Sequence, residues 1–159
     1  MNETRAVDCF YDYLLGILKI YADLAPVLMD EVERIKNDDM PGLDESLRLQ
    51  QAMLLKTRDF EAKVAGYQKE LGISAANLST AVVQLPEDER FRFYSLLGEF
   101  DQIMEQVRFY RDSCRELLQT KLYQMEKQAQ DSGLAQGATY DEFAESVSGS
   151  YAKVFETRI

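Results

Sequence analysis

A row of apolar side chains, repeated about every 3.5 residues from Phe10 to Ile35, constrains the fold of this chain more than any other feature. This spacing places all its members on one face of a helix and is typical of helices with coiled-coil packing. Only Glu31 is polar in it, and Pro26 is expected to bend the helix or remove one hydrogen bond. A long helix is therefore predicted over 10–35. The members of the row are Phe10, Leu14, Ile17, Tyr21, Leu24, Leu28, Glu31 and Ile35.

A second helix is predicted over 41–71, after a turn in the stretch "NDDMPG". Pro41 suits the first turn of a helix, and Gly72 suits the position that ends one. The apolar row of this segment is weaker, because Gln50 and Thr57 interrupt it. Its apolar members are Leu43, Leu47, Leu54, Phe60, Val64, Tyr67 and Leu71.

A third helix is predicted over 86–129, beginning at the acidic first turn of "LPEDER". The connector before it carries Leu78, Val82 and Leu85, which we expect to cover the end of the core. The apolar row of the third helix has no gap and contains Leu96, Phe100, Ile103, Val107, Tyr110, Cys114 and Leu117.

These patterns predict an all-α protein. The chain is rich in Leu, Glu, Gln, Lys, Arg and Ala and has only 3 Pro and 8 Gly in 159 residues, a composition that favours helix. We expect an antiparallel bundle of three long helices with coiled-coil character over residues 1–131. A flexible joint and an amphipathic C-terminal tail helix are predicted over 132–159.

Composition excludes several functions. The chain has no His, so catalytic triads, Cys-His nucleophiles, di-iron bundles and histidine phosphotransfer are excluded. Cys9 and Cys114 match neither a disulfide framework nor a zinc site, and the acidic clusters lack the pattern of a calcium loop. We therefore expect no catalytic residue, no metal site and no cofactor. An enzyme remains an alternative that no motif supports.

The charge and the absence of long apolar runs restrict the partners. A net charge of −10 disfavours nucleic acid and anionic membranes, which require clustered basic residues. No apolar run approaches the roughly 18 residues that a membrane span needs, so no direct membrane insertion is expected. The first residues, "MNETRAVD", do not have the pattern of a secretory signal. The simplest expectation is a cytoplasmic protein with reduced thiols.

The tail carries a second amphipathic pattern. Thr139 and Glu142 match a capping box, whereas Gly149 weakens the segment as a helix. A single helix of this length is marginal in water, so it needs a surface on which to dock. Three interpretations are open: a fourth core helix, a partner-binding segment, or disorder. The apolar face consists of Tyr140, Phe143, Val147, Tyr151 and Val154, with Phe155 beside it.

The start of the third helix, "FRFYSLLGEF", is a second candidate surface. Its apolar residues form a wider face than one helix seam requires. They are interpreted either as ordinary core or as a groove for an amphipathic helix of a partner. The candidate partner-binding residues here are Phe93, Leu97 and Phe100, with Phe91 and Tyr94 beside them.

The segment "NDDMPGLDESLRLQQAMLLKTRDFEAKVAGYQKELG" resembles the middle of FlgN-type flagellar export chaperones. The segment "LGEFDQIMEQVRFYRDSCRELLQTKLYQMEKQ" is similar to the last long helix of that family, and "ATYD" resembles the start of its tyrosine-bearing tail. The chain departs from the family at Arg111 and Cys114, where Asn is frequent, and in its longer tail. The matching positions in the middle segment are Asp39, Leu43, Leu47, Leu54, Leu55, Leu71 and Gly72.

The resemblance implies a cytosolic, non-enzymatic chaperone of flagellar type III secretion. Such proteins bind the C-terminal helical region of the hook-associated (hook–filament junction) proteins and prevent their premature association. They then deliver these clients to a component of the membrane export gate. The alternative is a helical adaptor or coiled-coil protein whose remaining apolar rows serve self-association.

Overall fold

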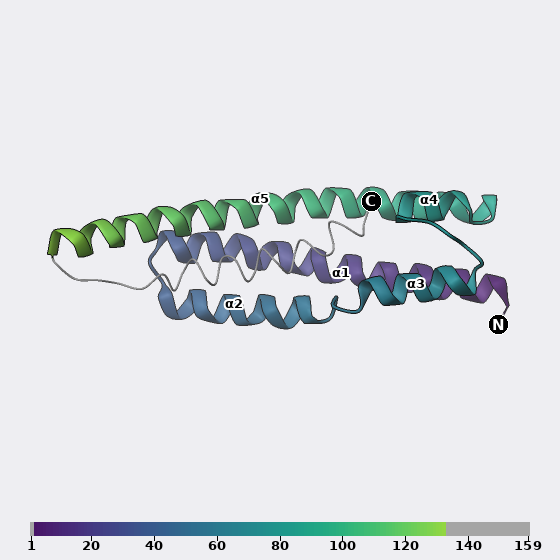
Figure 1. Ribbon diagram of the computed structural model, residues 1–159, viewed down its shortest axis with the longest axis horizontal. Coiled ribbons are helices and arrows are strands. Elements are labelled where there is room, and N and C mark those ends of the chain that lie inside the picture. Colours follow the sequence, from purple (N-terminus) through teal and green to yellow (C-terminus); the bar gives the residue numbers. More distant parts are fainter. Residues whose placement is uncertain (1, 133–159) are drawn as a thin grey trace.

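The computed structural model describes residues 2–132, which form helices joined by short turns and one longer connector (Figure 1). The predicted all-α class is confirmed for this part of the chain, within which no strand occurs. The predicted tail helix lies outside the described residues. The helices are α1 (Glu3–Lys36), α2 (Met40–Leu55), α3 (Phe60–Glu70), α4 (Leu78–Val83) and α5 (Glu87–Ser132).

Helix α1 is the centre of the arrangement. It packs against α5 on one side and against α2 and α3 on the other (Figure 1). Helices α1 and α5 run in the same direction, because Asp8 pairs with Arg92 at one end and Asp38 pairs with Lys121 at the other. Helices α2 and α3 return in the opposite direction (Figure 1).

The apolar row of α1 forms the core, as its spacing predicts. All eight members of the row are buried, and the largest, Phe10 and Tyr21, have no exposed surface. The helix is longer than predicted at its start and continues through Pro26. The row faces α5, α2 and α3 together, so α1 is the element around which the other helices assemble.

The prediction of one continuous second helix is wrong, because the structure has a break between α2 and α3. Thr57 lies in the break, and its hydroxyl donates to the Leu54 carbonyl at 2.7 Å. The Thr57 amide donates to the same carbonyl at 2.9 Å, and the Phe60 amide donates to the Thr57 carbonyl at 3.1 Å. These short-range bonds replace the i→i−4 ladder for one turn. The predicted end at Gly72 is correct, and Gly72 adopts a φ of 67° that suits glycine.

The turn between α1 and α2 is fastened by Asp39, which caps α2. Its carboxylate accepts from the Gly42 amide at 3.0 Å, and its amide donates to the Arg34 carbonyl at 2.9 Å. A side chain at position 42 would collide with the side chains of Arg34 and Asp39, so a larger residue there would displace the carboxylate that caps α2. The preceding residue, Asp38, has a φ of 54° and directs the chain back along α1.

The connector before α5 contains a short helix, α4, that the sequence pattern does not predict. Asn77 caps it by accepting from the Thr80 amide at 2.9 Å. Leu78, Val82 and Leu85 are each 1% exposed, so the connector covers the end of the core as predicted.

Candidate partner-binding site

The predicted groove residues at the start of α5 lie in the core. Phe93 is fully buried, and its ring lies 5.6 Å from that of Phe10 and 5.4 Å from that of Tyr11. Phe100 is 2% exposed, and Leu97 is half-buried against the same core. The wide apolar face of this segment is covered because α1 and α4 both pack on it. The structure thus favours the interpretation of ordinary core packing for Phe93 and Phe100.

The other two aromatic residues of this segment are on the surface. Phe91 is 80% exposed, and Tyr94 is 49% exposed. The remaining predicted partner-binding residues, in the tail, lie outside the described residues. They are Tyr140, Phe143, Val147, Tyr151, Val154 and Phe155.

A different candidate site lies where α5 extends beyond the rest of the molecule. The Lys121 ammonium lies 2.8 Å from the Asp38 carboxylate, which places Lys121 level with the α1–α2 turn. Residues 122–132 of α5 therefore continue past this turn for roughly 16 Å (Figure 1). One face of this extension borders a pocket of about 200 Å³ beside the turn.

We call this pocket the end pocket. Its floor is apolar and consists of Ile35, Leu43 and Leu118, which are all less than 7% exposed. Met40 and Met125 line it as well, at 41% and 37% exposed, and thioether side chains adapt easily to different apolar groups. An apolar floor with adaptable walls suits a buried aromatic or aliphatic side chain of a docked helix.

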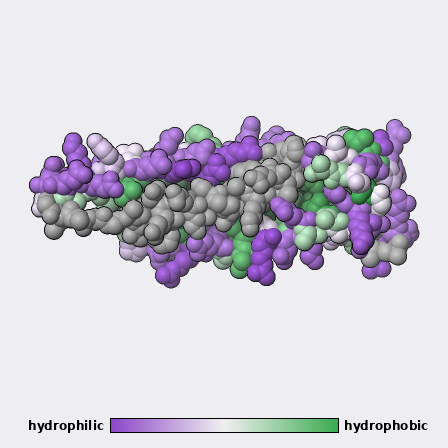
Figure 2. Space-filling model, viewed as in Figure 1, coloured by the Kyte–Doolittle hydropathy of each residue, from purple (hydrophilic) through white to green (hydrophobic). Residues whose placement is uncertain are grey.

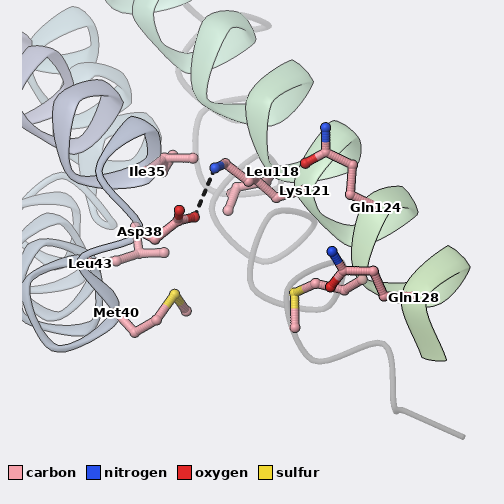
Figure 3. Close-up of a pocket in the computed structure, with 9 residues that line it drawn as sticks. Ile35, Asp38, Met40, Leu43, Leu118, Lys121, Gln124 and Gln128 are labelled. Atoms are coloured by element: carbon pink, nitrogen blue, oxygen red, sulfur yellow. Dashed lines mark ion pairs between the residues drawn. The ribbon is translucent and has the colours of Figure 1, made fainter. Parts of the chain in front are cut away.

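The rim of the end pocket is polar. Lys121 reaches from α5 to Asp38, and Gln124 and Gln128 follow on the same side of the helix (Figure 3). Two amides and an ion pair around an apolar floor form an arrangement common in protein interfaces, where a polar rim surrounds an apolar centre. The three rim residues of α5 are spaced by three and four residues, so each of three successive helical turns contributes one residue to the rim.

A buried polar layer crosses the middle of the core. The Glu31 carboxylate of α1 accepts a hydrogen bond of 2.6 Å from the Gln50 amide of α2, which also donates to Ser46 at 3.3 Å. Cys114 of α5 faces the same carboxylate, and its thiol lies 3.7 Å from the Leu28 carbonyl. Burial raises the pKa of Glu31, and the hydrogen bonds from Gln50 and Cys114 oppose this rise.

The thiol in this layer is not activated as a nucleophile. Burial and the neighbouring Glu31 raise the pKa of the Cys114 thiol, so it remains protonated and is a poor nucleophile. About three turns before Glu31 on the same helix, burial raises the pKa of Tyr21 to about 12 despite its contact with Thr57. Within residues 2–132, no cluster of Cys, Asp and Glu has a geometry that could hold a metal ion. We interpret the layer as a structural device that fixes how α1, α2 and α5 align.

The outer surface of α5 carries isolated large aromatic residues. Phe91, Phe109 and Tyr123 are 80%, 65% and 65% exposed. Their separations of 18 and 14 residues are close to whole numbers of helical turns, so all three point to one side. On the face shown in Figure 2, apolar residues gather near the end where α4 and the start of α5 lie.

No helix in the described part of the chain combines the length and apolar content needed to cross a membrane.

The sequence patterns do not identify the end pocket, because its walls come from three elements that meet only in the folded chain. One signal was available. The third predicted helix is much longer than the first, so part of it had to extend beyond its neighbour.

The chain was compared with protein-family models, with curated proteins and with solved structures. No family model, curated protein or solved structure matches it.

Proposed function

We propose that this protein is a FlgN-type chaperone that binds the C-terminal helices of hook–filament junction proteins in the cytoplasm and delivers them to the export gate. The proposal combines the resemblance of its middle and last helices to that family with an all-helical fold. In this proposal the working unit is an antiparallel bundle of three long helical segments with coiled-coil character. The tail adds an amphipathic helix to this bundle. The chain acts by binding, without catalysis.

The observation that carries the proposal is the end pocket. A client helix that inserts one apolar side chain over Ile35, Leu43 and Leu118 would bury it on a floor that already exists. Further apolar residues of the client, spaced by three and four, would continue along the exposed extension of α5. The amides of Gln124 and Gln128 would meet polar groups at the edge of such a helix.

Calorimetry with a hook–filament junction protein tests the proposal. The full-length client is expected to bind, and a client without its C-terminal helical segment is expected to lose binding. Changing Met125→Glu, which places a charge at the pocket, should weaken the complex by roughly tenfold or more.

The matched control is Gln130→Glu. It adds the same charge on the same extension, but about half a helical turn away from the pocket side. This variant should bind the client as the unaltered chain does. Undiminished binding after deletion of the client's C-terminal segment would contradict the proposal.

The exposed aromatic side of α5 favours a second candidate function, self-association as a helical adaptor. Phe91, Phe109 and Tyr123 lie along one side of a helix, where a second copy could cover them. These side chains are separated by several turns, so an interface would have to extend along most of α5.

Light scattering tests self-association. If α5 pairs with a second copy, the unaltered chain is a dimer or higher oligomer, and the double change Phe91→Ser, Phe109→Ser makes it a monomer. Both side chains are largely exposed, so the fold should tolerate the substitutions. A chain that is monomeric at every concentration would exclude this function and leave the chaperone proposal in place.

A further inference from the structure

The end pocket lies beside the point where the described chain stops. Ser132 ends α5, and 27 residues follow it, from 133 to 159. The pocket residue nearest in sequence is Gln128, about one turn earlier. Whatever follows Ser132 is therefore held at a high local concentration next to the pocket.

The length of the joint permits a return to the pocket. Residues 133–139 span up to roughly 23 Å when extended, whereas the level of Met125 lies only about 10 Å back along α5 from Ser132. Tyr140 and Phe143, the first aromatic residues of the tail, thus fall within reach. The part of the apolar row from Tyr140 to Val154 would cover about 21 Å as a helix, close to the length of α5 between Gln128 and Cys114.

The distribution of charge also favours the tail as the occupant of the end pocket. Between residues 108 and 127, α5 carries five basic and three acidic side chains, although the chain as a whole has a net charge of −10. Residues 139–159 contain four acidic and two basic side chains. Lys121 and Arg111 are already paired with Asp38 and Asp112, but the excess of basic residues on this part of α5 still faces an excess of acidic residues in the segment attached after Ser132.

We propose that the end pocket is the docking site of this chain's own tail, with Tyr140 and Phe143 placed over Ile35, Leu43 and Leu118. The tail runs back along α5, antiparallel to it, and takes helical form there. The tail thus docks on the helical bundle of its own chain. A client that uses the end pocket must then displace the first turn of the tail.

Hydrogen exchange of the full chain, without any client, tests the docking. Amides in 139–147 are expected to be protected in the unaltered chain. Met125→Glu should reduce this protection by roughly tenfold or more, whereas Gln130→Glu should leave it unchanged. Exchange at the rate of an unstructured peptide in the unaltered chain, or equal protection in both variants, would overturn the proposal.

Methionine oxidation gives the reciprocal measurement. The double change Tyr140→Ala, Phe143→Ala should uncover the pocket, so Met125 should oxidise several-fold faster. Met29, which is 52% exposed on the outer side of α1, serves as the internal reference and should not change. An unchanged Met125 rate would contradict docking at this pocket.

One further outcome distinguishes the chain's own tail from the tail of a second copy. Protection of the tail that rises with protein concentration would identify the tail of a second copy and overturn docking within one chain. Because the exchange measurement uses no client, it can succeed while the calorimetry of the chaperone proposal fails, and the reverse also holds.

Discussion

Replacing Gln50 with Leu should lower the free energy of unfolding by about 3 kcal/mol at neutral pH. The Gln50 amide donates to the Glu31 carboxylate at 2.6 Å, and the two side chains are 0% and 3% exposed. Without this donor, a buried carboxylate loses its shortest hydrogen bond in a place that water does not reach. Chemical denaturation measures the loss.

Gln51→Leu is the matched control for this prediction. Gln51 is the next residue on the same helix but is exposed, so its replacement should change stability by no more than about 0.5 kcal/mol. The double change Glu31→Leu, Gln50→Leu should recover most of the stability, because two apolar side chains can replace a buried polar pair. Equal losses for the Gln50 and Gln51 variants would show that the polar layer contributes nothing.

The same carboxyl group makes stability depend on pH. Burial raises the pKa of Glu31 in the folded chain, so between its ordinary and its raised value the folded state binds more protons than the unfolded state. Its contribution to stability is fully present below the ordinary value and is lost as the pH rises through the raised one. The loss caused by Gln50→Leu should accordingly shrink in acid, and Glu31→Gln should remove this part of the pH dependence.

The position of Glu31 also shows what the sequence can predict. A helical repeat follows from geometry alone, so the row of α1 identifies its buried face even where one member is a carboxylate. The same repeat places Gln50, Thr57 and Cys114 on helix seams. It does not show that Glu31, Gln50 and Cys114 meet in one layer, because this depends on how far the helices slide past one another.

The break between α2 and α3 has a different cause. Gln50 and Thr57 both interrupt the apolar row of the second predicted helix, and both are buried. Gln50 remains in a helix because a partner across the core accepts its hydrogen bond. Thr57 lies just after the end of α2, and its hydroxyl bonds to the Leu54 carbonyl three residues earlier instead of to a partner across the core. Residue type alone therefore does not predict whether a polar residue in an apolar row remains inside a helix or lies at a break.

The end pocket also depends on how the helices are placed relative to one another, which the apolar repeat does not show. The repeat in the third helix is continuous, but burial stops where the neighbouring helices stop, and Met125 is 37% exposed while Leu118 is 6% exposed. The start of α5 shows the opposite case. There the apolar face is wide because α1 and α4 both pack on it, and width alone does not distinguish a core face from a groove for a partner.

Phe93→Ala should therefore destabilise the fold by about 3–5 kcal/mol, which is a large part of the stability of a typical domain. Phe93 packs between the rings of Phe10 and Tyr11, and the Arg92 guanidinium covers Tyr11 at 4.8 Å from its ring centre. Truncation leaves a cavity in this aromatic cluster that the surrounding helices cannot close. Phe91→Ala, two residues earlier and 80% exposed, should cost no more than about 0.5 kcal/mol.

The conservative change Phe93→Leu separates a role in the core from a role in binding. It keeps an apolar side chain in the cluster and should cost less than about 1.5 kcal/mol, so the chain stays folded. If Phe93 acts only through the core, this variant binds a client with unchanged affinity, whereas Met125→Glu does not. A folded Phe93→Leu variant that loses the client would place Phe93 in the binding surface after all. That result would imply that the start of α5 opens when a partner helix arrives.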